Sequence, residues 1–163
     1  MIIKVRNKVH LEIDDFKFKC CIGKNGFKLK KNEGDKSTPK GTFSLGTLYY
    51  RADKVSKPIS KLKLKKITKN LGWCNDPLNK NYNSEIKIKN KIKCEKLFRK
   101  DFKYDYLIVI NYNTNKIIQG KGSAIFLHLT KNYKPTLGCI AIGKKDFLIL
   151  LKILKKNTKI KIG

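Results

Sequence analysis

The chain has 163 residues, of which 40% are hydrophobic, and this is enough to fill one core without disulfide or metal staples. We therefore expect a single domain over residues 1–163, acting as a monomer. The formal net charge of +27 suits an anionic partner, but only three of the 39 basic residues are arginine, whose planar fork reads guanine and phosphate. The composition thus argues against a specific nucleic-acid reader and favours weak attraction to an anionic polymer.

Two features of the sequence bear on location. The amino end, Met1 to Arg6, becomes charged before it could build the apolar part of a secretory signal, and no small-residue cleavage site follows. The best apolar run, residues 147–154, is interrupted by Lys152 and is far shorter than the roughly 20 residues of a membrane span. We expect no membrane span and no recognisable export signal, so both the cell envelope and the cytoplasm stay open.

The amino-terminal part of the chain alternates apolar and polar residues. Three runs at period two, residues 2–5, 9–13 and 16–20, predict half-buried strands, and Asp14-Asp15 predicts a hairpin turn. Residues 23–41 are rich in Gly, Lys and Asn and predict a loop. That loop closes on Thr38-Pro39-Lys40-Gly41, where proline fixes φ and glycine permits a turn before the next strand.

The middle of the chain, residues 53–90, is rich in lysine and shows no clear periodicity. It predicts long excursions over the surface of a β core, and such loops are usually functional or disordered. Trp73 lies within this segment. The favoured interpretation is that Trp73 anchors a loop on the core, and the alternative is that it forms a wall of a substrate site.

Strand patterns return in the last third of the chain. Residues 106–112, 123–129 and 139–142 are apolar on both faces, as in the centre of a sandwich or barrel. Leucines and Phe147 then recur at helical spacing over about 145–156, with Asp146 in the first turn to offset the helix dipole. A strand over 158–162 ends the chain. The sequence therefore predicts a mainly β fold, a sandwich or barrel, with one clear helix.

One segment carries the residues for thiol acyl transfer, which needs a thiolate, a base and amides aimed at an oxyanion. If the strands ending near Leu129 and starting at Cys139 run antiparallel, His128 and Cys139 lie close together, at the two ends of the loop that connects these strands. Gly138 permits close approach of a substrate and leaves the amides of Gly138 and Cys139 free for the oxyanion. Lysines at positions 131, 134, 144 and 145 are expected to favour the thiolate.

The same residues also have a structural interpretation. A histidine in an apolar strand is often a satisfied core residue, and a free cysteine is often an inert buried thiol. The five cysteines are an odd number, lack C-x-x-C spacing and have few histidines near them, so we expect no structural metal site and at least one unpaired thiol. The pattern alone leaves both interpretations open.

A resemblance to a known family favours catalysis. The segments Gly122-Ser123-Ala124-Ile125-Phe126-Leu127-His128-Leu129 and Pro135-Thr136-Leu137-Gly138-Cys139-Ile140-Ala141-Ile142 resemble the catalytic core of the L,D-transpeptidases of YkuD type, with a strand histidine followed by Ser/Thr-x-Gly-Cys. Upstream, Thr38-Pro39-Lys40-Gly41-Thr42-Phe43 is similar to the family's Thr-Pro-x-Gly-x-Phe, and Trp73 with Asp76 also matches.

The resemblance implies a YkuD-like fold, a location in the cell envelope or periplasm, and a mechanism. Cys139 would attack the diaminopimelate carbonyl of a tetrapeptide stem and expel D-alanine, while His128 would act as general base and acid. Gly138 would serve the catalytic loop, Thr136 would shape that loop, and Thr136 and Leu137 would contact the peptidoglycan stem peptide. An amine acceptor gives a cross-link, and water gives a carboxypeptidase; no cofactor or metal is implied.

The sequence departs from the family in two respects. The gap between His128 and Cys139 is shorter than in many members, and Ala141 and Ile142 stand where an arginine often follows the cysteine. The group that recognises the donor's carboxylates is therefore open, and one of the lysines is a candidate. The departures indicate a divergent branch of the family.

Two other functions share features with this sequence. Thr136-Leu137-x-Cys139 is similar to part of the sortase motif, but sortases need a downstream arginine and none follows Arg99. The second alternative is a non-catalytic basic module that binds nucleic acid or an anionic wall polymer, with Cys139 structural. Reactivity of the thiol distinguishes the enzyme from the binding module.

Overall fold

Strands make up nearly all the regular structure of the computed structural model, which describes residues 1–29, 31–89 and 92–163. Within those residues the one helix is α1 (Lys144–Ile153), slightly shorter than the predicted 145–156 at its carboxyl end. The strands are β1 (Ile2–Val5), β2 (His10–Ile13), β3 (Phe16–Cys21), β4 (Phe27–Lys28), β5 (Thr38–Pro39), β6 (Gly41–Tyr50), β7 (Leu64–Lys66), β8 (Leu71–Cys74), β9 (Glu85–Lys87), β10 (Cys94–Lys96), β11 (Tyr106–Ile110), β12 (Phe126–Thr130), β13 (Ile140–Gly143) and β14 (Lys159–Ile162). The predicted mainly β fold class is confirmed.

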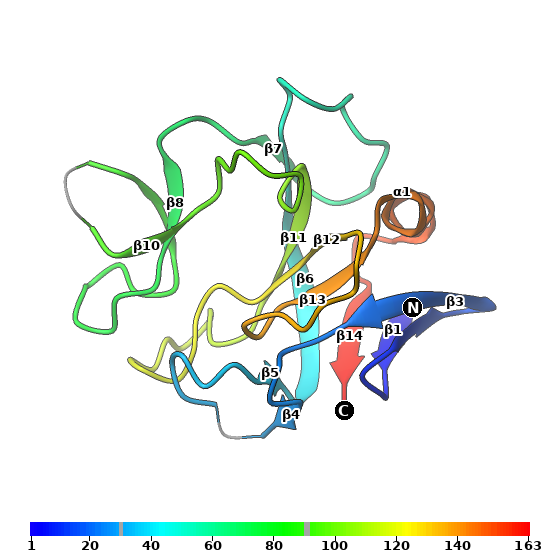
Figure 1. Cartoon of the computed structure of the whole chain (residues 1–163), viewed down its shortest axis with the longest axis horizontal. Coiled ribbons are helices and arrows are strands. Elements are labelled where there is room, and N and C mark those ends of the chain that lie inside the picture. Colours follow the sequence, from blue (N-terminus) through cyan, green and yellow to red (C-terminus); the bar gives the residue numbers. More distant parts are fainter. Residues whose placement is uncertain (30, 90–91) are drawn as a thin grey trace.

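Eight of the strands close into a barrel (Figure 1). Hydrogen-bonded neighbours follow the order β11-β12-β13-β3-β2-β1-β14-β6, and β6 pairs again with β11 to complete the ring. The length of β6 makes this possible, because its first residues pair with β14 and its later residues with β11. Closure leaves the ring without a free edge that could pair with another chain.

The amino-terminal hairpin forms as predicted. Ile13 pairs with Phe16 across β2 and β3, so Asp14 and Asp15 make a two-residue turn. Asp14 adopts a φ of 47°, in the left-handed region that Asp tolerates in such turns. The predicted strands near residues 2–5, 106–112, 123–129, 139–142 and 158–162 are also present, with ends shifted by a few residues.

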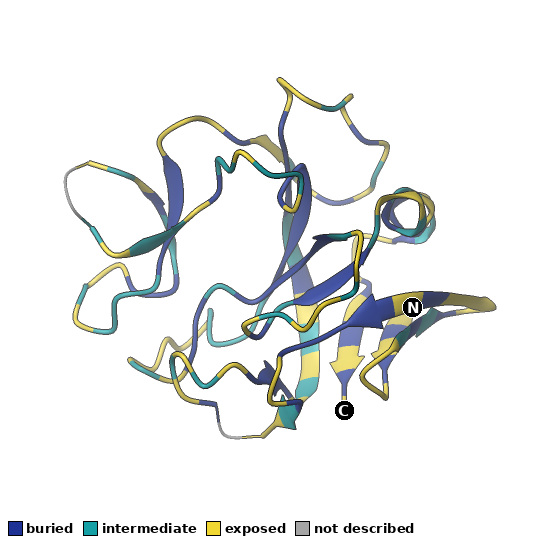
Figure 2. Ribbon diagram, viewed as in Figure 1, coloured by how far each residue is buried: buried dark blue, intermediate teal, exposed yellow. Residues whose placement is uncertain are grey.

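β12 is buried on both faces and separates two apolar clusters. Leu127 and Leu129 pack into the barrel core, against which α1 also packs. Phe126 belongs to a second cluster outside the barrel, and His128 points the same way because side chains alternate along a strand. Figure 2 shows the unbroken burial of β11, and of β12 as far as Leu129, in contrast to the alternation along β14. The strand thus presents His128 on the outer surface of the barrel.

A small second sheet covers the second cluster. β8 lies at its centre, between β9 and β10. The Trp73 ring of β8 meets the Phe126 ring edge-on, with 5.5 Å between centroids, and its Nε1–H donates to Asn83 Oδ1 at 2.9 Å. The small sheet is therefore anchored to β12 through an aromatic contact.

The prediction of irregular loops over residues 53–90 was wrong. The segment contains β7, β8 and β9, and the unpredicted β10 follows it. These strands have three or four residues each, too few for period two to show against the lysine-rich background. Trp73 lies in a strand rather than a loop, although it packs on the core as expected. The predicted loop over 23–41 contains the short β4 and β5 pair. Three residues lie outside the described part of the chain: Lys30 and Asn90, one from each predicted loop, and Lys91.

Candidate active site

His128 and Cys139 lie in one pocket on the outer surface of the barrel. His128 is paired with Ala141 in the β12–β13 ladder. Cys139 stands two residues before Ala141, so alternation places its side chain on the same face as His128. Both residues line a cavity of about 770 Å³, a size typical of small-molecule sites. The structure therefore brings the two predicted catalytic side chains together.

The route by which they meet differs from the prediction. The prediction was conditional on antiparallel strands, but β12 and β13 are parallel. The connecting loop returns beside the end of β3, where the Thr136 amide donates to Ile22 O at 2.9 Å. Cys139 is consequently delivered by a loop at the start of β13, whereas His128 comes from the middle of β12.

The backbone at the start of β12 and just before it holds the Cys139 sulfur. The Phe126 amide donates to Sγ at 3.4 Å, and the thiol donates to Ala124 O at 3.3 Å. Burial raises the pKa of this thiol to about 12, and the Phe126 amide and Lys31 only partly oppose it. The expectation that lysines 131, 134, 144 and 145 favour the thiolate was wrong, because burial dominates. Cys139 is therefore a protonated thiol near neutral pH.

His128 is a neutral imidazole in the same range. Burial lowers its pKa to about 4, and the positive charges of Lys103 and Arg99 add to the effect. Its Nδ1 lies 3.0 Å from Leu129 O. Because a carbonyl can only accept, Nδ1 carries the proton and Nε2 is the nitrogen that can receive another. The pocket thus pairs a neutral thiol with a neutral base.

The loop before Cys139 has a tightly fixed backbone. Thr136 Oγ1 accepts the Gly138 amide at 3.1 Å and donates to Cys139 O at 2.6 Å. Gly138 has a φ of 139°, and a Cβ there would lie 2.9 Å from Ser37 O, so a larger residue does not fit. The expectation that the Gly138 amide is free was wrong. Within the described residues the Cys139 amide donates no hydrogen bond, and Leu137 is 77% exposed beside it.

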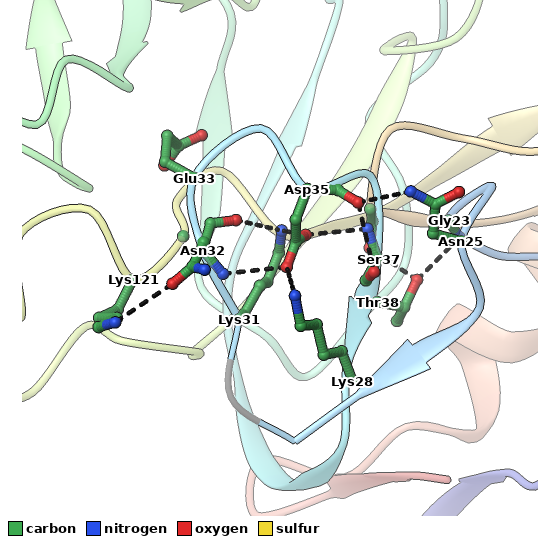
Figure 3. Close-up of polar contacts among 12 residues, drawn as sticks. Gly23, Asn25, Lys28, Lys31, Asn32, Glu33, Asp35, Ser37, Thr38 and Lys121 are labelled. Atoms are coloured by element: carbon green, nitrogen blue, oxygen red, sulfur yellow. Dashed lines mark hydrogen bonds and ion pairs between the residues drawn. The ribbon is translucent and has the colours of Figure 1, made fainter.

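Thr38 supports this loop from far upstream. Its Oγ1 donates to Gly138 O at 2.8 Å and accepts the Gly23 amide, also at 2.8 Å (Figure 3). Thr38 is itself fully buried. The sequence identified the motif that begins at Thr38 but gave this residue no role, since a contact across a hundred positions has no local pattern. The first residue of the motif therefore helps to hold the loop that carries Cys139.

Lys31 places a buried cation at the pocket. The residue is 3% exposed, and its Nζ lies 2.7 Å from Asp35 Oδ1 (Figure 3). Although burial alone would raise the pKa of Asp35, hydrogen bonds from Lys31 and from two amides lower it to about 2. Lys31 also lines the cavity and lowers the pKa of Cys139 slightly. Sequence reasoning missed it because it lies in a lysine-rich segment predicted to be a loop.

The opposite side of the pocket is built by the segment that contains β10. The Tyr104 hydroxyl donates to Glu95 Oε1 at 2.9 Å, and its ring packs against the His128 ring with 5.3 Å between centroids. Arg99 lies over the Tyr104 ring at 5.0 Å and forms two hydrogen bonds with Asp101, at 2.6 and 2.9 Å. No pattern in the sequence pointed to Tyr104 or Glu95.

Positive charge predominates around the cavity. Six lysines or arginines line it against two glutamates, namely Lys31, Lys93, Arg99, Lys103, Lys131 and Lys134 against Glu33 and Glu95. Such a lining attracts ligands that carry carboxylates. Among residues 1–29, 31–89 and 92–163, no group of three or more His, Cys, Asp or Glu side chains is placed to hold a metal ion. Nor does that part of the chain contain a helix long and apolar enough to cross a membrane.

Comparison with known proteins identifies a family and two similar structures. The YkuD family model, described as the L,D-transpeptidase catalytic domain, matches residues 5–162. The crystal structure of the helical cell shape determining protein Pgp2 from Campylobacter jejuni superposes with a TM-score of 0.52 at 17% identity, over 99% of this chain and 46% of that chain. Its K307A mutant gives a TM-score of 0.51 at the same identity and coverage. No curated protein sequence matches significantly. The chain thus spans less than half the length of structures that share its fold.

Proposed function

This chain belongs to the L,D-transpeptidase catalytic domain family, and from that premise we propose that it catalyses acyl transfer on peptidoglycan stem peptides through a Cys139 thioester. The observation that carries the proposal is the pocket shared by Cys139 and His128. A nucleophile and a base must meet in one site for covalent acyl transfer. The positively lined cavity beside them suits a peptide that carries free carboxylates.

The first half-reaction forms the thioester. His128 Nε2 takes the Cys139 proton as the sulfur attacks the diaminopimelate carbonyl of a tetrapeptide stem. The protonated imidazole then gives that proton to the amine of the departing D-alanine, and the carbon–nitrogen bond breaks. Because both groups rest in neutral forms, proton transfer accompanies attack rather than preceding it.

The loop of Thr136 to Cys139 would complete the site. The Cys139 amide is the donor proposed for the oxyanion, since the Gly138 amide is engaged by Thr136. Gly138 supplies the backbone conformation, and Thr136 keeps the loop in shape. Leu137, exposed at the edge of the cavity, would contact the stem peptide.

The second half-reaction depends on the acceptor. His128 would take a proton from an incoming amine or from water, which then attacks the thioester and regenerates the thiol. An amine gives a transpeptidase, and water gives an L,D-carboxypeptidase. With Lys31 buried beside the nucleophile, this lysine is the proposed carboxylate-binding group in place of the missing arginine.

Membership of a family of cell-envelope enzymes makes the envelope the proposed location. Pgp2, which has a similar fold, is a determinant of helical cell shape, and a role in wall architecture is the corresponding proposal here. The second candidate function is a non-catalytic basic module for an anionic polymer. The observation that favours it is the burial that keeps Cys139 protonated.

A muropeptide assay tests the proposal. Wild-type protein should release D-alanine from tetrapeptide muropeptides, and Cys139→Ala should lower the rate by more than about 1000-fold with the fold intact. Cys21→Ala, which removes a thiol from β3 outside the pocket, should retain most of the rate. Absence of release by the wild type, with no difference between the two variants, would favour the binding module.

A further inference from the structure

Cys74 and Cys94 face each other across the small sheet. The register of β8 and β10 pairs Cys74 with Cys94, Trp73 with Glu95 and Gly72 with Lys96. Directly opposed residues of an antiparallel pair point to the same face. The two thiols therefore lie on one face of this sheet, and Trp73 and Glu95 lie on the other.

The alternation of hydrogen bonds along β8 places the two cysteines in the type of antiparallel pair whose Cα atoms are closer together. Cys74 directs both its amide and its carbonyl away from β10, because the amide donates to Ser84 O at 2.9 Å and the carbonyl accepts from the Asn83 amide at 2.8 Å. Hydrogen-bonded and non-hydrogen-bonded pairs alternate along an antiparallel ladder. The Leu97 amide, an odd number of residues after Cys94, donates to Leu71 O at 3.1 Å, which agrees with a non-hydrogen-bonded pair at Cys94. Cys74 and Cys94 thus form a non-hydrogen-bonded pair, for which the Cα separation is about 4.5 Å.

That geometry falls within the range of a disulfide. Bridged cysteines have Cα atoms about 4.4–6.8 Å apart and Cβ atoms directed toward each other. The Cys94 sulfur already lies over β8, because a Cβ added to Gly72 would be 3.2 Å from it. Glycine at position 72 leaves the space that this sulfur occupies.

We propose that Cys74 and Cys94 are a redox pair that forms a cross-strand disulfide stapling β10 to β8. The oxidant is a small-molecule or protein disulfide. The Cys94 thiolate, from the more exposed of the two residues, attacks it to give a mixed disulfide and one released thiol. Cys74 then attacks the Cys94 sulfur and releases the second thiol, so two thiols are oxidised and one disulfide is reduced.

The staple would act on the pocket through Glu95. This residue follows Cys94 directly and accepts the hydrogen bond of Tyr104, whose ring packs on His128. Fixing β10 to β8 therefore fixes one side of the cavity. Cys20 and Cys21 lack such a partner, since they are paired in the sheet with Ile142 and Ala141. This inference is independent of the proposed acyl transfer.

The test is disulfide mapping of the whole chain at mildly alkaline pH. Burial raises the pKa of Cys94, and alkaline pH supplies its thiolate. After treatment with oxidised glutathione, non-reducing peptide mapping should show the link between Cys74 and Cys94 as the main internal disulfide. Cys94→Ser, at a partly exposed position that tolerates the change, should remove the link, and the control Cys21→Ser should retain it.

Thermal melting provides a second measurement. Closing the loop between the two cysteines should raise the melting temperature of the oxidised protein by about 10 °C over the reduced protein, and Cys94→Ser should lose this difference. Persistence of a glutathione adduct on Cys94, a different internal pairing, or thiols left free would overturn the proposal. A link with no gain in melting temperature would overturn the stapling role.

Discussion

The two sides of the pocket are built in opposite ways. The barrel side, residues 123–141, comes from β12, the start of β13 and the loop between them, and the two strands are fixed by a backbone ladder and a continuous apolar core. The sheet side, residues 93–104, comes from a three-residue strand and irregular chain, fixed by hydrogen bonds and ring contacts of single side chains such as Tyr104 and Glu95. The barrel side holds the proposed nucleophile and base, and the sheet side encloses them.

The difference suggests a division of labour. Strands with many neighbours can hold a thiol and an imidazole in place against the cost of burying them. A wall made of a few polar contacts can differ between relatives without disturbing the core, and such a wall is where substrate preference is easily altered. Substitutions on the barrel side should therefore affect chemistry and stability strongly, and those on the sheet side should have smaller effects.

After loss of the nucleophile, the largest effect is expected at the base. His128→Gln keeps a polar side chain of similar size but removes the group that shuttles the proton, so the rate of D-alanine release should fall about 1000-fold. Circular dichroism should show an unchanged fold. A loss of less than tenfold would mean that the barrel side does not supply the base.

The second effect concerns acid. His128 has a pKa of about 4 in the folded protein, against an ordinary value of 6.5. Between these two pH values the unfolded chain binds a proton at His128 that the folded chain does not. The free energy of unfolding should therefore fall by about 3 kcal/mol between neutral pH and about pH 4. Urea unfolding at several pH values measures it, and His128→Gln should lose this part of the slope. If the free energy of unfolding depends on pH equally in both proteins, His128 is not a buried neutral imidazole. Asp35 does not interfere, because its pKa of about 2 lies below the pH range of the measurement.

A third substitution tests how the cysteine loop is held. Thr38→Val keeps the shape of the side chain but leaves the Gly23 amide and the Gly138 carbonyl without their buried partner. The free energy of unfolding should decrease by about 2 kcal/mol. Thr42→Val is the matched control, because Thr42 is exposed on β6 and valine suits a strand. Similar stabilities of the two variants would show that Thr38 does not support the loop.

The smallest effect is expected on the sheet side. Tyr104→Phe removes the hydroxyl that bonds Glu95 but keeps the ring on His128, so stability should fall by about 1 kcal/mol and the rate by less than tenfold. Tyr106→Phe removes a hydroxyl bonded to Ser56 O away from this cavity, and it should cost similar stability without a rate change. A rate loss at Tyr104 as large as that at His128 would break the distinction between the two sides.

The sequence predicted the barrel side far better than the sheet side, for physical reasons. Buried strands such as β11 and β12 require apolar residues on both faces, and the motif around Cys139 requires a glycine with positive φ; both leave local patterns. The parallel pairing of β12 and β13 leaves none, since antiparallel and parallel strands of this length have similar compositions. Lys31 and Tyr104 reach the pocket through long-range packing, and the raised pKa of Cys139 follows from burial that only the fold creates.

The most direct test of the central claim is the mass of the intact protein after exposure to a carbapenem, followed by peptide mapping. A competent Cys139 opens the β-lactam and keeps all its atoms, so we expect one whole-drug adduct, on Cys139, which is absent from both Cys139→Ala and His128→Gln over the same time. Cys20, Cys21, Cys74 and Cys94 should stay unmodified. If the wild type gains no adduct, or if Cys139 reacts no faster than the other four thiols, the pocket holds the family's fold without its chemistry.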